Sequence, residues 1–67
     1  MLKAEAIQAM SEGKKVTHRH FTLYEWVTMT PDGNLLFDDG VKCSPMEFWR
    51  WRTDPTYDKD WMIIIKI

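Results

Sequence analysis

The stretch that decides the fold is residues 23–43, which read LYEWVTMTPDGNLLFDDGVKC. It contains two turns of the same chemistry, Pro31-Asp32-Gly33 and Asp38-Asp39-Gly40. In each turn the aspartate can cap its own backbone, and the glycine takes the left-handed conformation. Apolar and β-branched residues flank both turns, as in hairpins. The stretch therefore predicts an antiparallel meander with strands at 23–30, 35–37 and 41–43.

The segment before the meander predicts a helix followed by a further strand. Residues 2–12 are rich in strong helix formers and place apolar side chains on one stripe. Gly13 supplies a stop, and Lys14 and Lys15 complement the negative end of the helix dipole. A helix this short must dock on another element to persist. Residues 15–21 alternate in the way that favours a strand.

The segment after the meander has two possible secondary structures over residues 45–52 and one over residues 61–67. Ser44-Pro45-Met46-Glu47 has the pattern of a capping box and predicts a short helix at 45–51. The alternation of aromatic and arginine residues over 48–52 is also compatible with a strand, so both readings stay open. Residues 54–56 interrupt this element. Residues 61–67 are apolar and β-branched, which predicts a central or interface strand.

Together these elements predict one α+β domain over residues 1–67. We expect the N-terminal helix to pack on a small curled antiparallel sheet of four or five strands, with a possible short second helix at 45–51. With 67 residues and one cysteine, Cys43, the chain has no intrachain disulfide. It also lacks zinc-site spacing, so self-association is the favoured source of added stability.

Assembly and partners follow from the same composition. The terminal strand is apolar on both faces, and one N-terminal helix covers only one face of a small sheet. We therefore expect at least a homodimer with the terminal strand or the tryptophan cluster at the contact; a second helix covering the other face is the alternative. The net charge of −1 argues against non-specific nucleic-acid binding. The longest apolar run, residues 61–65, is too short to span a membrane.

The residues that could carry catalysis are explained more simply by structure. His18 and His20 share one face of a predicted strand, but a metal site needs a third ligand, so a structural or surface pair is favoured. Cys43 has no neighbouring base and is expected to be an inert thiol, which fits a reducing cytoplasm. The aspartates lie in predicted turns. We therefore predict a non-enzyme with no catalytic residue, no metal and no cofactor.

The most informative cluster is FWRWR at residues 48–52. Aromatic rings stack on nucleobases, and arginine forks onto phosphate oxygens. The same side chains also suit a protein interface, or a core with salt bridges. A second aromatic and cationic group lies near the first strand junction. The candidate ligand- or partner-binding residues are Arg19, His20, Phe21, Tyr24, Trp26, Trp49, Arg50, Trp51 and Arg52.

Several short motifs, spread over most of the chain, resemble those of the Thoeris anti-defence protein 2 family of small phage proteins. The matching segments are Glu5-Ala6-Ile7, Gly13-Lys14-Lys15-Val16, Asp32-Gly33 and Asp60-Trp61. The chain departs from the family pattern at His18, where the family tends to have arginine, and at Phe21, where it tends to have tryptophan. It is also shorter than typical members, and its FWRWR segment has no clear counterpart.

The resemblance implies a function and a location. Members of that family are non-catalytic homo-oligomers that sequester cyclic-nucleotide-type immune signals in pockets between subunits. A chain similar to them is expected in the cytoplasm of a phage-infected bacterium, as a dimer or higher oligomer. Many phage chains of this size instead bind and inhibit a host protein, and this alternative stays open.

Overall fold

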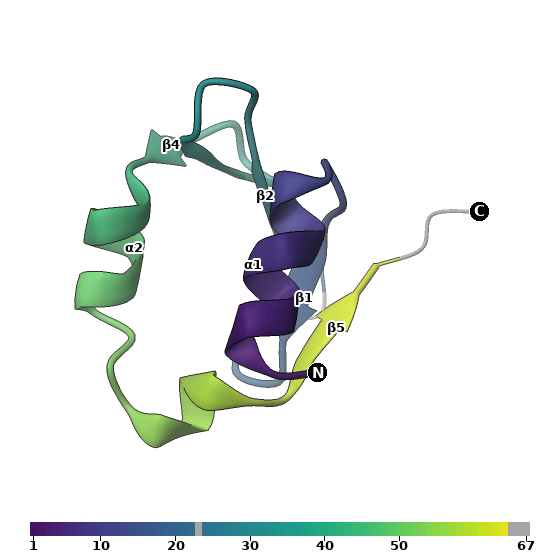
Figure 1. The fold of residues 1–67 in the computed structure, drawn as a ribbon, viewed down its shortest axis with the longest axis vertical. Coiled ribbons are helices and arrows are strands. Elements are labelled where there is room, and N and C mark those ends of the chain that lie inside the picture. The colour runs from purple at the N-terminus through teal and green to yellow at the C-terminus, as the bar shows by residue number, and fades with distance from the viewer. Residues whose placement is uncertain (23, 65–67) are drawn as a thin grey trace.

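The computed structural model describes residues 1–22 and 24–64. In chain order its elements are α1 (Lys3–Ser11), β1 (Val16–His18), β2 (Val27–Met29), β3 (Leu35–Phe37), β4 (Lys42–Cys43), α2 (Pro45–Arg50), the 3-10 helix η1 (Pro55–Asp58) and β5 (Trp61–Ile63) (Figure 1). The strands form one sheet in the order β4-β3-β2-β1-β5, with every neighbouring pair antiparallel. The predicted α+β architecture is confirmed, and residues 45–50 are helical.

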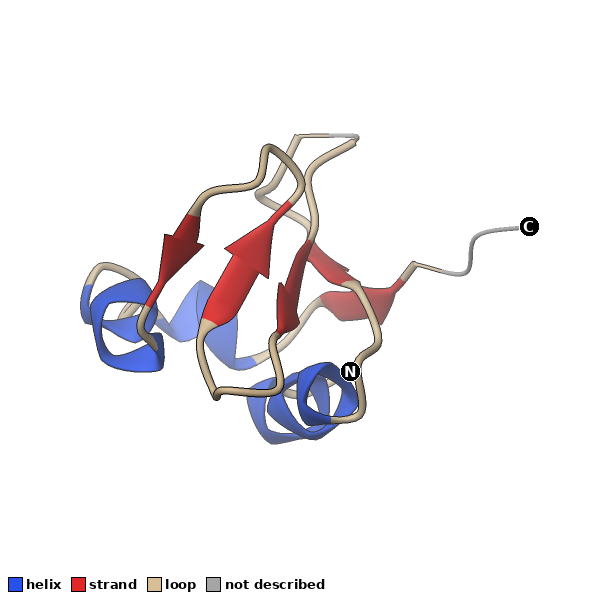
Figure 2. Cartoon of the chain, turned by 90° about the horizontal axis from the view of Figure 1, so that it is seen from above, coloured by secondary structure: helices blue, strands red, loops and turns tan. Residues whose placement is uncertain are grey.

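Both helices pack on the same face of the sheet (Figure 2). The core contains Ala6 and Met10 of α1 together with Phe48 of α2. The Phe48 ring lies 5.6 Å from the ring of Phe37 in β3 and 6.4 Å from that of Trp61 in β5. The alternative in which a second helix covers the other face is therefore wrong, because the core side chain of α2 points to the side that α1 already covers.

The two predicted turns of the meander are confirmed. Gly33 and Gly40 both have φ of +87°, which is the left-handed conformation that glycine tolerates best. Their N–H groups close the turns by donating to the carbonyls of Thr30 (2.9 Å) and Phe37 (3.0 Å). These two turns connect β2 to β3 and β3 to β4, so local chemistry positions the middle of the sheet.

The strands at 15–21 and 23–30 are shorter than predicted. β1 ends at His18 because the next backbone groups turn inward: His20 N–H donates to His18 Nδ1 at 3.1 Å, and Phe21 N–H donates to the His18 carbonyl at 2.9 Å. Before β2, the N–H of Thr22 donates to the Glu25 carboxylate. Such local bonds replace the hydrogen bonds of a strand ladder.

Of the two positions predicted for the terminal strand, the central one is wrong, because the strand lies at the edge of the sheet, next to β1; the interface position stays a prediction. Only Trp61 is buried, whereas Met62 and Ile63 are 56% and 38% exposed. The outer edge is partly covered by the backbone of Met1, which exchanges hydrogen bonds with the N–H and carbonyl of Trp61. The predicted continuation through residues 65–67 lies outside the described residues.

Asp60, which leads into β5, gives a first testable prediction. Its φ is +69°, a conformation that costs a β-branched residue about 1–2 kcal/mol but that asparagine tolerates. We expect Asp60→Val to lower the free energy of unfolding by about that amount, and Asp60→Asn to change it little. Urea denaturation measures both. The control is Asp38→Val, at an exposed aspartate without a positive φ; equal losses for the two valine variants would contradict the prediction.

Candidate functional site

The predicted binding residues do not form a single site within one chain, but the structure joins two of them across the fold. Phe21 follows β1 and Arg52 follows α2, and the Arg52 guanidinium carbon lies 5.8 Å from the centre of the Phe21 ring. The same carbon lies 4.1 Å from the centre of the Phe48 ring. We call this group of Phe21, Phe48 and Arg52 the arginine cradle.

The side chains of the FWRWR segment face different surroundings because the segment covers the C-terminal end of α2. Ser44 Oγ accepts a hydrogen bond from the Glu47 N–H at 3.2 Å and so starts α2. From this start Phe48 faces the core, and Trp49 is half-buried, with its ring 5.5 Å from that of Trp61. Trp51 lies just after the helix and is 80% exposed. The segment therefore contributes to both the core and the surface.

The remaining predicted residues point to different surroundings. Trp26 lies under the Lys15 ammonium group at 4.4 Å. Arg19 forms a long ion pair with Asp60 at 3.7 Å, and Tyr24 is 81% exposed. The His20 ring lies 6.0 Å from the ring of Tyr57. Of these residues only His20, through its sequence neighbour Phe21, adjoins the arginine cradle.

Arg52 carries an incompletely paired cation. Its Nη1 donates to the carbonyl of Phe48 at 3.1 Å. Among the described residues, Arg52 has no carboxylate within 4.0 Å. Its Nε is buried and has no hydrogen-bond acceptor. Among the described residues, this is the one buried side-chain nitrogen or oxygen atom without a partner. A buried charged donor left unpaired destabilises a protein by about 1–3 kcal/mol or more, so this atom requires an explanation.

Cys43 lies in the neighbourhood of the arginine cradle, in surroundings that favour the protonated thiol. Burial raises the pKa of Cys43, and the nearby Glu47 carboxylate raises it further, against the opposing effect of Arg52. Because the thiolate is the nucleophilic form, a raised pKa makes the thiol less reactive. This geometry supports a packing role for Cys43.

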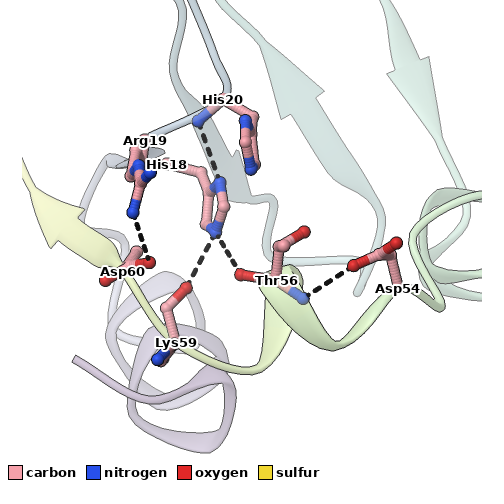
Figure 3. A network of polar contacts seen from close by, with 7 residues as sticks. All are labelled: His18, Arg19, His20, Asp54, Thr56, Lys59 and Asp60. Carbon is pink, nitrogen blue, oxygen red and sulfur yellow. Dashed lines mark hydrogen bonds and ion pairs between the residues drawn. The ribbon is translucent and has the colours of Figure 1, made fainter.

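A buried histidine ties the chain after β1 to η1 (Figure 3). His18 is 2% exposed, and its Nε2 lies 2.9 Å from the Thr56 carbonyl and 2.8 Å from the Lys59 carbonyl. Because both partners are acceptors, Nε2 carries the proton, and Nδ1 accepts from His20 N–H. Both ring nitrogens are therefore in use, which favours the structural role over metal binding.

Asp54 precedes η1, and its carboxylate leads us to predict that the fold loses stability in acid. Its Oδ1 accepts from Thr56 N–H at 2.9 Å, and this backbone hydrogen bond holds the pKa of Asp54 below its ordinary value of 3.8. A lowered pKa stabilises the fold above the unfolded value, and the contribution is lost as the pH falls through the folded value. Asp54→Asn keeps an acceptor that does not titrate. We expect urea denaturation of this variant to depend less on pH below 3.8 than that of the unmodified chain; identical pH dependence would contradict this.

Two surface hollows lie away from α2. One of about 430 Å³ lies between α1 and β5, lined by Ala4, Gln8, Ala9 and Ile63 among others. Another of about 520 Å³ is lined by Met1, Arg19, Asp60, Trp61 and Met62. Of the predicted binding residues, only Arg19 lines either hollow. Neither hollow is lined by a residue of the arginine cradle.

Sequence reasoning missed the partners of His18. Thr56 and Lys59 contribute backbone carbonyls, which leave no side-chain signal, and they lie 38 and 41 residues from His18. Asp54 could have been found, because an aspartate followed by proline is a usual start for a short helix. The sequence pattern at residues 54–56 predicts only a break in the chain.

Searches of protein-family models, curated proteins and solved structures found no match to this chain. In the described residues, no helix has the length and apolar character needed to cross a bilayer. The resemblance to the Thoeris anti-defence protein 2 family therefore stays a prediction, carried by the short motifs alone.

Proposed function

We propose that this chain is a non-catalytic binding protein that sequesters a nucleotide-derived immune signal in a pocket completed by a second copy. The observation that carries the proposal is the end of α2. Trp51 presents an 80% exposed ring, and its two sequence neighbours, Arg50 and Arg52, have no carboxylate within 4.0 Å among the described residues. An exposed ring on a segment with two uncompensated cations suits a base with its phosphates.

Isothermal titration of the full chain against cyclic nucleotides and ADP-ribose derivatives tests this proposal. Removing a stacked ring costs about 1–3 kcal/mol per base, so Trp51→Ala is expected to weaken binding roughly tenfold or more. Arg50→Ala is expected to weaken binding through lost phosphate contact. Lys42→Ala, which removes an exposed cation on β4, is the matched control. Absence of heat with every compound would refute the proposal for that panel.

The uncovered face of the sheet supports association of two copies. Val16, Val27 and Leu35 are buried under the helices, so their strand neighbours lie on the opposite face. Strand register places Leu36 opposite Thr28 there, and Thr17 opposite Met62. None of the described residues forms a layer over this face (Figure 2). A partly apolar face of this kind suits contact with another copy.

Assembly gives a prediction of its own. At high micromolar concentration, light scattering is expected to give at least twice the chain mass of 8.0 kDa. Leu36→Glu places a charge in the middle of the uncovered face and should shift the mass toward the monomer while the circular dichroism stays folded. Met46→Glu introduces the same charge at a 77% exposed position on α2 and serves as control. A monomeric mass for the unmodified chain would contradict the assembly.

The same face favours a second candidate function, inhibition of a host bacterial protein. If the chain is monomeric, Leu36, Met62 and Trp26 remain available to a different partner. Affinity capture from bacterial lysate, compared between the unmodified chain and Leu36→Glu, tests this candidate. A specific host protein that the unmodified chain captures and Leu36→Glu does not would support this candidate. An identical set of captured proteins for the two chains would count against it. In either function we place the chain in the cytoplasm of a phage-infected bacterium.

A further inference from the structure

Arg52 differs from the other arginines of this chain in how it is held. Arg50 is exposed, and the Arg19 side chain is 73% exposed in its pairing with Asp60. Arg52 is half-buried, lies 4.1 Å from the Phe48 ring centre, and is fixed at one end by the bond from Nη1 to the Phe48 carbonyl. A guanidinium group held in this way has lost most of its rotamer freedom before any ligand arrives.

The donors that remain on Arg52 form a fork. In a planar guanidinium, Nε–H and one N–H of Nη2 point in the same direction, and their spacing matches two oxygens of a phosphate or carboxylate. Nη1 is already in use, and Nε lacks an acceptor among the described residues. An oxyanion at this edge would both pair the cation and satisfy the unpaired donor.

We infer that the Nε–Nη2 edge of Arg52 is the phosphate-binding fork of this chain. The nucleotide class of the ligand rests on the proposed function, but the fork itself requires only a phosphate group. Nε is enclosed, so binding requires a side chain of the cradle to shift. Phe21 forms the looser wall, because its ring centre lies 5.8 Å from the guanidinium carbon against 4.1 Å for Phe48. Entry of the phosphate therefore displaces Phe21.

Glu47 is the competing partner within the chain. Glu47 and Arg52 both act on the Cys43 thiol, so the carboxylate lies in the same neighbourhood, although beyond ion-pair distance. If Glu47 moved onto Arg52 in solution, the fork would already be occupied. Comparison of the unmodified chain with Glu47→Gln separates an intrachain ion pair from a site open to ligands.

The test is nuclear magnetic resonance of the ¹⁵N-labelled full chain with inorganic pyrophosphate as the probe. The arginines are Arg19, Arg50 and Arg52, so each contributes one Nε–H signal to a simple spectrum. We expect the Arg52 signal, assigned by its loss in Arg52→Lys, to shift most on titration. Arg52→Lys keeps the charge and loses the fork, and is expected to bind pyrophosphate roughly tenfold more weakly, whereas Lys42→Ala, which removes an exposed cation on β4, should bind with nearly unchanged affinity.

The outcomes distinguish this inference from the proposed function. An Arg52 signal that stays fixed at saturating pyrophosphate overturns the fork, even if nucleotides bind elsewhere on the chain. A shift of the Arg52 signal caused by Glu47→Gln alone also overturns it, because the carboxylate is then its partner. A shift with pyrophosphate when no nucleotide binds supports the fork and counts against the nucleotide function. Amide dispersion confirms that each variant is folded.

Discussion

Replacing Trp61 with alanine is expected to remove most of the stability of this domain. The ring is fully buried and lies 4.7 Å from His18, 5.5 Å from Trp49 and 5.7 Å from Phe21, measured between ring centres. Truncating a buried tryptophan costs about 3–5 kcal/mol. A domain of this size has roughly 3–10 kcal/mol in total at the usual stability per residue. The loss is therefore comparable with the whole free energy of unfolding.

Urea denaturation followed by circular dichroism measures this effect without relying on the removed fluorophore. Trp51→Ala is the matched control, because it makes the same chemical change at an 80% exposed ring and should alter stability by less than about 0.5 kcal/mol. If Trp61→Ala does not fold at all, Trp61→Phe keeps an aromatic ring but loses the bond from Nε1 to the Tyr57 carbonyl, 2.8 Å long. Equal stability of the two alanine variants would disprove the central role of Trp61.

The parts of the fold that sequence reasoning predicted are those with local causes. Each of the turns at Gly33 and Gly40 is determined by a few residues that are adjacent in sequence. The same holds for the cap that Ser44 gives to α2. The position of β5 at the sheet edge does not, because it depends on pairing with β1, more than forty residues earlier in the chain. The apolar composition of a strand therefore does not tell an edge position from a central one.

The candidate site was predicted less well than the fold for a related reason. FWRWR indicates aromatic and cationic chemistry, but the helical phase set by Ser44 decides which ring is buried. Phe48 enters the core and Trp51 is exposed, and neither outcome can be read from composition. The contact between Phe21 and Arg52 joins segments about thirty residues apart and leaves no pattern in either segment. The site is therefore a tertiary property of this chain.

His18 is expected to be the second residue whose loss unfolds the domain or loosens it strongly. Its ring lies 4.7 Å from the rings of both Trp61 and Tyr57, so alanine would leave a cavity in the aromatic core. The carbonyls of Thr56 and Lys59 would also lose their shared donor. The cavity and the unpaired groups together predict a loss of about 3 kcal/mol or more for His18→Ala.

Two further variants separate ring packing from hydrogen bonding. His18→Phe keeps an aromatic ring but offers no donor to η1 and no acceptor to His20 N–H, so it should remain clearly less stable than the unmodified chain. His18→Gln places an amide N–H near the former position of Nε2 and should recover part of the lost stability. The His20 amide gives a local readout, because its bond to Nδ1 is broken in His18→Phe and its hydrogen exchange should become faster. If His18→Phe matched the unmodified chain in urea denaturation and in His20 exchange, the hydrogen bonds between His18, the chain after β1 and η1 would contribute nothing, and aromatic packing alone would hold these segments together.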